Sequence, residues 1–312
     1  MLLTIAICTW NRSLLLRQTL EQMKSLSIPD GISLELLVVN NNSKDTTEEC
    51  IKSFLRSLPI RYLFEPETGL SPARNCAVRH ARGEYIIWTD DDVLVDQKWL
   101  VSYADAFVKY PDAVFFGGPI IPYFEGTPPT WLVKILPQIP SAFGMRDLGN
   151  EPIALTSKAA LPWGANFAVR TREQRWHPFD PSLGLKGKKR VVAEETTMLS
   201  GMLDAGLSGR WVPDARVRHY ISKALQTTDF LRTFYHGLGD ADGRCSPDIA
   251  VPQLFGAPRY LWRKAVTFEI KYLFGRYLSD PSVWVEDLKS SAGTFGKING
   301  YRARQHGMPT VN

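Results

Sequence analysis

Short apolar runs alternate with amphipathic stretches over the first third of the chain. Runs of strand length lie at 3–9, 34–39, 61–64, 84–88 and 113–118. Between them, stretches with apolar residues three and four apart, the spacing of one helix face, lie at 13–25, from about residue 45, at 72–81 and at 97–109. Strands that alternate with helices favour an α/β fold with a doubly wound, mostly parallel sheet.

The alternation breaks down over residues 119–160. Prolines are frequent there, so we expect an irregular excursion that forms a substrate wall rather than long regular elements. A strand at 165–170 and a helix at 194–205 are expected after it. Residues 212–217 have the pattern of a short strand pair or of an edge strand.

Three consecutive aspartates, Asp90, Asp91 and Asp92, follow the apolar run at 84–88. Adjacent like charges raise one another's pKa unless a cation is close. Mg²⁺ and Mn²⁺ prefer oxygen ligands and keep coordination positions open for substrate phosphates. One aspartate here would be an ordinary helix cap, but three in a row behind a buried strand favour a metal–diphosphate site.

Polar residues also follow two other predicted strands. The first strand ends in a run that contains Thr9, Asn11 and Arg12, and the second in a run that contains Asn40, Asn41, Asn42 and Asp45. Because parallel strands share polarity, both runs should lie at the same sheet edge as the aspartates, where open α/β sheets bind ligands. Each run alone is typical of turns and caps, but together they favour a nucleotide pocket.

Four further candidates each have a chemical and a structural interpretation. Arg74 follows a glycine loop at a predicted helix start, with Ser71 as the expected cap, and would bind phosphate or a nucleobase unless it is a surface arginine. Glu194 and Glu195 begin a helix, where they would complement the helix dipole or accept a proton from a hydroxyl. His219 would be a metal or phosphate ligand or a polar core residue. The glycine-rich stretch 235–244 would be a lid, a phosphate contact or a loop that ends a helix.

Composition narrows the class of protein. The net charge of +5 over 312 residues is too mild to indicate nucleic-acid binding. Four cysteines without CxxC spacing indicate reduced thiols in the cytoplasm. The apolar start lacks the basic region of a signal peptide, and no apolar run approaches the roughly 20 residues of a membrane span. We therefore expect a cytoplasmic protein, either free or peripheral on the cytoplasmic face of the membrane.

Aromatic and cationic residues mix at roughly helical spacing over 258–278. An amphipathic helix that lies on an anionic membrane surface has this pattern. A helix that packs on the catalytic domain with a solvated basic face has it too. Both interpretations stay open.

In this order, the motifs resemble those of the family 2 glycosyltransferases, an inverting group with the GT-A fold. The matching segments are 9–12, 39–45, 69–75, 90–92, 163–170, 179–184, 194–195 and 212–219. The resemblance covers about residues 3–220. It implies that 1–118 binds the nucleotide sugar, that 119–220 binds the acceptor and supplies the catalytic base, and that 221–312 is a mainly helical extension.

The resemblance also implies a role for each matching residue. The nucleotide sugar would be bound by Thr9, Asn11, Arg12, Asn40, Asn41, Asn42, Asp45, Arg74, Asp90 and Asp91. The donor-sugar or acceptor pocket would be lined by Trp163, Gly164 and Asn166. Mn²⁺ or Mg²⁺ would be held by Asp92, Asp90 and His219. Glu195, with Glu194 before it, would be the catalytic base, although it is one methylene longer than the family's usual Asp.

The implied reaction is metal-dependent transfer of a hexosyl or deoxyhexosyl group from a nucleotide-diphosphate sugar to a hydroxyl. The acceptor would be a glycan or a polyprenyl-diphosphate-linked sugar in cell-surface polysaccharide biosynthesis. A phosphohydrolase would carry its aspartates on the first strand, and a nucleotidyltransferase would have a glycine-rich loop after that strand. A non-catalytic carbohydrate-binding relative would not need both the three aspartates and the glutamate pair.

Overall fold

The computed structural model describes residues 1–186, 189–191, 194–247 and 251–305. The chain falls into two units, one formed by 1–123 with 144–220 and the other by 124–143 with 221–312. The expected division placed all of 119–220 in one domain. Residues 124–143 instead group with the C-terminal helices.

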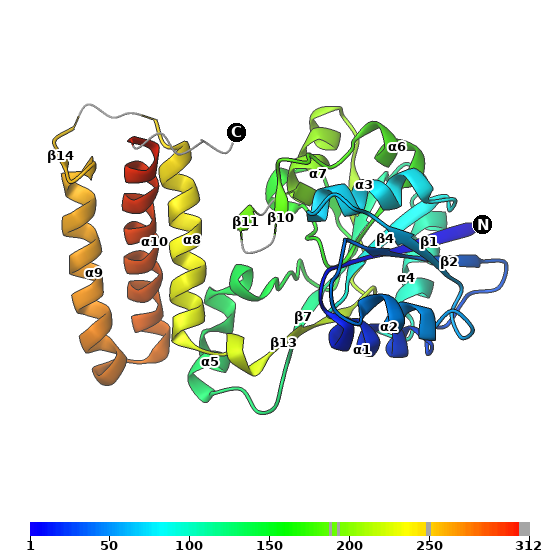
Figure 1. The fold of residues 1–312 in the computed structure, drawn as a ribbon, viewed down its shortest axis with the longest axis horizontal. Coiled ribbons are helices and arrows are strands. Elements are labelled where there is room, and N and C mark those ends of the chain that lie inside the picture. Colours follow the sequence, from blue (N-terminus) through cyan, green and yellow to red (C-terminus); the bar gives the residue numbers. More distant parts are fainter. Residues whose placement is uncertain (187–188, 192–193, 248–250, 306–312) are drawn as a thin grey trace. The chain divides into compact units, whose positions relative to one another are not determined.

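The first unit is built on an eight-stranded sheet in the order β3-β2-β1-β4-β9-β6-β12-β8. Figure 1 labels three of its strands, β1, β2 and β4. The strands are β1 (Leu2–Thr9), β2 (Ser33–Asn40), β3 (Ile60–Phe64), β4 (Tyr85–Asp90), β6 (Phe115–Gly117), β8 (Ala154–Leu155), β9 (Phe167–Arg170) and β12 (Gly209–Trp211). Strand β9 runs antiparallel to β4 and β6, and β8 antiparallel to β12, whereas the other pairs are parallel. The predicted mostly parallel sheet is confirmed.

Helices cover both faces of this sheet. One core cluster joins alternate β1 residues, Leu3, Ile5 and Ile7, to α1 (Ser13–Met23), α2 (Thr47–Ser53) and α4 (Trp99–Lys109). The other contains Ala6 and packs against α3 (Leu70–His80) and α7 (Glu194–Asp204), and α6 (Thr171–Trp176) follows β9. Because these strands are buried on both faces, their sequences are continuous apolar runs.

A second, three-stranded sheet consists of β5 (Val93–Val95), β13 (Val217–Ile221) and β7 (Ile120–Phe124). Residues 212–217, expected as a short strand pair or an edge strand, form mainly the turn between β12 and β13, in which Ala215 N donates to the carbonyl of Val212. Strand β13 pairs with β5 so that His219 lies opposite Val93. This pairing places His219 next to Asp92, the last of the three consecutive aspartates. A further hairpin joins β10 (Gly184–Lys186) to β11 (Lys189–Val191).

The start of α3 also differs from the prediction. The helix begins at Leu70 after Gly69, whose φ of 146° favours glycine, so Ser71 is inside the helix and is not its cap. The Ser71 hydroxyl instead donates to the carbonyl of Leu183 at 2.8 Å.

The second unit contains α5 (Thr130–Ile135) and three long helices, α8 (Thr228–Cys245), α9 (Arg259–Leu278) and α10 (Pro281–Gln305). Helix α10 lies between α8 and α9 (Figure 1). A short hairpin, β14 (Gln253–Leu254) with β15 (Ala257–Pro258), precedes α9. The predicted helical extension is confirmed. Among the described helices, none combines the length and apolar character that crossing a membrane requires.

The stretch 235–244 is not a loop, because it lies inside α8. An added Cβ at Gly239 would lie 1.9 Å from the carbonyl oxygen of Gly293, and one at Gly243 would lie 2.2 Å from that of Lys297. The glycines therefore let α8 and α10 pack backbone against backbone. These contacts outweigh the low helix propensity of glycine.

We expect Gly296→Ala to destabilise the second unit. Its Cβ would lie 1.9 Å from the carbonyl oxygen of His236, so the helices must separate, at a cost of about 1–3 kcal/mol in the free energy of unfolding. The matched control is Gly237→Ala in α8, where a Cβ meets nothing within 4 Å, and should stabilise by about 0.5–1 kcal/mol. Urea unfolding of both variants checks this, and equal stabilities would contradict it.

Candidate active site

The C-terminal ends of β1, β2 and β4 meet at one edge of the sheet. Thr9 pairs with Asn40, and Cys8 pairs with Asp90. The polar runs that follow these strands therefore lie together, as their shared polarity predicts.

Arg12 joins the polar run after β1 to two of the aspartates. Its Nη1 lies 3.0 Å from Asp91 Oδ1 and 2.7 Å from Asp92 Oδ2. The Thr9 hydroxyl donates to Asp91 Oδ2 at 2.7 Å. Burial, together with the charge of Asp92, raises the pKa of Asp91 to about 7.

Thr19 was missed by the sequence analysis. From α1, its buried hydroxyl donates to the carbonyl of Asp91 at 2.9 Å. The signal was present, because Thr19 is a polar residue on the apolar face that Leu16 and Leu20 form. Such a residue usually has a specific hydrogen-bond partner.

Asp92 and His219 form the part of the site that faces a potential ion. His219 Nε2 lies 3.4 Å from Asp92 Oδ1. Burial alone would raise the pKa of Asp92, but His219 and Arg12 hold it below its ordinary value. Asp92 Oδ1 is buried and accepts no hydrogen bond from the described residues.

These donors fit a divalent ion that binds together with substrate. A carboxylate oxygen suits Mg²⁺ and Mn²⁺, and a neutral imidazole nitrogen is a common metal ligand. The described residues contain no group of three or more His, Cys, Asp or Glu side chains that could hold a metal alone. An ion held by Asp92 and His219 would therefore take its remaining ligands from phosphate and water, as Mg²⁺ and Mn²⁺ commonly do.

Arg74 is buried at the centre of the acidic groups. Its Nη1 lies 2.9 Å from Glu194 Oε1 and 4.0 Å from Glu195 Oε2, and its Nη2 lies 3.7 Å from Asp90 Oδ1. Its guanidinium carbon lies 5.3–5.8 Å from the ring centres of Trp88, Phe167 and Phe179. A buried charge needs such partners, so Arg74 is a member of the site and not a surface arginine.

Glu195 stands in the first turn of α7 with one oxygen already held. Gly164 N donates to Glu195 Oε1 at 3.2 Å. An added Cβ at Gly164 would lie 2.8 Å from Arg74 Nη2, so glycine is needed for this close approach. Burial and the neighbouring charge of Glu194 raise the pKa of Glu195 to about 7.

Asn166 has a different position from the one expected. Its side chain is fully buried, and its Oδ1 accepts from Trp99 Nε1 at 2.8 Å and from the Tyr103 hydroxyl at 2.9 Å. Its Nδ2 donates to the carbonyls of Pro119 and Ala215. All four hydrogen bonds of the amide are used within the protein, so this side chain does not line a sugar pocket. Half-buried Trp163 carries the Arg146 guanidinium 5.2 Å from its ring centre.

Asn41 and Asp45 shape the loops at the edge of the sheet. Asn41 Oδ1 accepts from Gly69 N at 2.7 Å, which ties the end of β2 to the start of α3. Asp45 accepts from Ser13 N at 3.2 Å and from Thr47 N at 3.1 Å, so one carboxylate caps two helices.

Asn11, Asn40 and Asn42 also order these loops. Asn11 and Asn42 have φ values of 53° and 61°, in the left-handed region that asparagine tolerates. Asn11 Oδ1 accepts from Lys44 N at 2.7 Å, and Asn40 Oδ1 accepts from Ser43 N at 2.9 Å. Their contacts with a nucleotide stay predictions.

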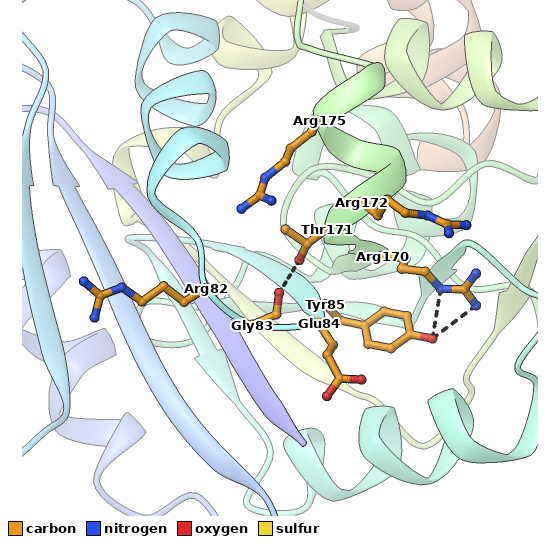
Figure 2. Close-up of a pocket in the computed structure, with 8 residues that line it drawn as sticks. All are labelled: Arg82, Gly83, Glu84, Tyr85, Arg170, Thr171, Arg172 and Arg175. Atoms are coloured by element: carbon orange, nitrogen blue, oxygen red, sulfur yellow. Dashed lines mark hydrogen bonds between the residues drawn. The ribbon is translucent and has the colours of Figure 1, made fainter.

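A cavity of about 420 Å³ lies at the other end of β4 (Figure 2). It is lined by Arg82, Gly83, Glu84, Tyr85, Arg170, Thr171, Arg172 and Arg175. Tyr85 begins β4 and Asp90 ends it, so this cavity is at the opposite sheet edge from the aspartates. Arg170 donates to the Tyr85 hydroxyl and Arg175 to the carbonyl of Ala81. The cavity is not part of the candidate site.

Two relatives align with most of the chain. The succinoglycan biosynthesis protein ExoM of Rhizobium meliloti is 24% identical over 242 residues, which are 77% of this chain and 74% of that protein. The glucosyl-dolichyl phosphate glucuronosyltransferase of Haloferax volcanii is 23% identical over 235 residues, which are 71% of this chain and 67% of that protein.

A solved structure and a family match agree with these relatives. The mannosyltransferase PcManGT from Pyrobaculum calidifontis, in complex with GDP-Man and Mn²⁺, superimposes with a TM-score of 0.61. It is 15% identical, and the match covers 95% of this chain and 85% of that one, which shows a shared GT-A fold. Residues 4–168, more than half of the chain, match Glycosyl transferase family 2. As its motifs predicted, this protein therefore belongs to Glycosyl transferase family 2 and is a glycosyltransferase.

Proposed function

We propose that this enzyme transfers a hexosyl or deoxyhexosyl group from a nucleotide-diphosphate sugar to a hydroxyl of a glycan or lipid-linked acceptor. The observation that carries the proposal is the position of Arg74, which contacts Asp90 at 3.7 Å and Glu195 at 4.0 Å. One guanidinium thus connects the proposed donor site to the proposed base. A donor held by the aspartates and an acceptor beside Glu195 would be close enough to react.

Glu195 is the proposed general base. A carboxylate whose pKa is about 7 accepts a proton more readily than an ordinary glutamate and is still about half ionised at neutral pH. It would take the proton of the acceptor hydroxyl while that oxygen attacks the anomeric carbon from the face opposite the diphosphate. Because no enzyme nucleophile intervenes, the configuration inverts, as is typical of this family. Glu194, paired with Arg74 at 2.9 Å, supports the base.

The aspartates, with His219, are proposed to bind the donor. Asp92 and His219 would hold Mn²⁺ or Mg²⁺ together with the diphosphate, with Asp90 nearby, and the ion when bound stabilises negative charge on the leaving diphosphate. Arg12 contacts Asp91 and Asp92 and limits their mutual repulsion. Thr9 and the Asn40–42 segment are proposed to contact the nucleoside. The Mn²⁺ in PcManGT supports manganese as the ion.

The acceptor class is proposed from the relatives. One is named for succinoglycan biosynthesis, and the name of the other gives a dolichyl-phosphate-linked sugar. Both names favour a role in building cell-surface polysaccharide, on a glycan or a polyprenyl-linked sugar.

The four cysteines form no disulfide, which suits a reducing compartment and supports a cytoplasmic location.

Incubation with UDP-, GDP- and dTDP-sugars and Mn²⁺ tests the reaction class. We expect one donor to release its nucleoside diphosphate and to do so faster when a suitable glycan is added. Release of inorganic phosphate from a monoester, or of pyrophosphate from a nucleoside triphosphate and a sugar phosphate, would instead indicate a phosphohydrolase or a nucleotidyltransferase. Binding of a glycan with no turnover of any donor would indicate a non-catalytic relative.

Two variants should separate catalysis from donor binding. Glu195→Gln removes the base, so transfer should fall on the order of 10²- to 10⁴-fold, while calorimetry detects unchanged nucleotide binding. Asp92→Ala should abolish both transfer and manganese-dependent nucleotide binding. The control is Asp204→Asn, a largely exposed carboxylate in α7, the helix that carries Glu195. Near-normal turnover of Glu195→Gln would remove it as the base.

The activity should rise with pH through about pH 7. Glu195 must be ionised to accept a proton, and its pKa of about 7 sets the midpoint of the acid limb of kcat/KM. Glu194→Gln removes a negative charge that raises this pKa, so the midpoint should move to lower pH. Rate measurements from pH 5 to 9 on both proteins, with circular dichroism to verify folding, check this. An identical midpoint in the folded variant would assign the limb to another group.

A further inference from the structure

Helix α9 carries apolar side chains on two opposite faces. Leu261, Ala265 and Tyr272 are buried and face the bundle. The outer face consists of residues that are 48–78% exposed at helical spacing: Val266, Ile270, Leu273, Phe274 and Tyr277. We call these five residues the outer apolar face of α9.

Among the described residues of its unit, no helix covers this outer apolar face. Since α10 lies between α8 and α9, α9 is at the edge of the bundle (Figure 1). A contiguous exposed apolar face therefore marks a contact surface.

The charges on α9 define what this surface can contact. Five cations lie along the helix, namely Arg259, Arg263, Lys264, Lys271 and Arg276. Its one acidic residue, Glu269, accepts from Arg232 of α8 at 2.9 and 3.0 Å and from Ser291 of α10. The negative charge of Glu269 is therefore compensated within the bundle. Arg259 and Arg263 are exposed, and among the described residues neither has an ion-pair partner.

We propose that α9 binds the surface of a membrane that contains anionic lipids. The outer apolar face would enter the boundary between headgroups and acyl chains, while the arginine and lysine stems extend their charges to the lipid phosphates. Tyr277 also suits this boundary between headgroups and acyl chains, since it combines an apolar ring with a hydroxyl. Two copies of this chain joined through this face would bring their cations together, which disfavours a dimer contact. The inference goes beyond the proposed reaction, because it depends on α9 alone.

Vesicle co-sedimentation of the full chain tests the proposal. The protein should bind vesicles of phosphatidylcholine mixed with phosphatidylglycerol, bind phosphatidylcholine alone much more weakly, and lose binding as salt is raised. No donor or acceptor is present, so failure of the proposed transfer reaction would not affect this result. Equal binding to both vesicle types, or none to either, would overturn the proposal.

Two double variants test the face itself. Phe274→Ser with Tyr277→Ser removes apolar contact, and Arg259→Glu with Arg263→Glu reverses charge; each should lower partitioning onto anionic vesicles on the order of tenfold or more. Their matched controls lie in the first unit and should bind like the unmodified chain: Trp176→Ser with Val108→Ser, both 77–81% exposed, and Arg56→Glu with Lys109→Glu, both exposed.

Light scattering provides the remaining outcome. The unmodified chain and the Phe274→Ser, Tyr277→Ser variant should have the same oligomeric state and the same urea-unfolding midpoint. A dimer that this variant dissociates would assign the outer apolar face to a second copy of the chain and would overturn the membrane proposal. Variants that stay folded and bind vesicles as well as the unmodified chain would overturn it too.

Discussion

Arg74 is a full positive charge whose side chain is only 3% exposed, and Asp90, Glu194 and Glu195 are arranged around it. A guanidinium in such a place is tolerated only when carboxylates and polarizable rings replace the water it has lost. Glu194 provides the closest partner, at 2.9 Å, while Asp90 and Glu195 lie within 4.0 Å. The start of α7 is thereby held against the end of β4, although about 100 residues separate them in the chain.

The same arrangement accounts for the unequal properties of the two glutamates. Glu194 lies closest to Arg74, so its negative charge is directly compensated. Burial and the nearby charge of Glu194 raise the pKa of Glu195 to about 7, and the more distant Arg74 offsets this only in part. Two adjacent carboxylates thus acquire different chemistry from one asymmetric contact. A longer side chain than aspartate still suits a base whose other oxygen is held by Gly164 N.

Contacts within each unit explain where the sequence pattern misled. Residues 235–244 contain three glycines and read as a loop, yet the stretch is helical, because at Gly239 and Gly243 the close approach of α8 and α10 leaves no room for a Cβ. Asn166 stands in a motif and reads as a ligand contact. Trp99 and Tyr103, distant in the chain, donate to its amide oxygen, and its amide nitrogen donates to the carbonyls of Pro119 and Ala215. Neither packing partner is visible from local spacing.

The sequence by itself determined the strand and helix alternation, and the strand polarity put Thr9, Asn40 and Asp90 at one edge of the sheet. It did so because apolar periodicity and chain direction are local properties. Tertiary structure alone decided which acids face which cations. Arg12 reaches Asp91 and Asp92 across 79 and 80 positions, and Arg74 reaches Glu194 across 120. Sequence spacing does not reveal such pairs, because they form only when the chain folds. The burial of each group and its distance from other charges then set its pKa.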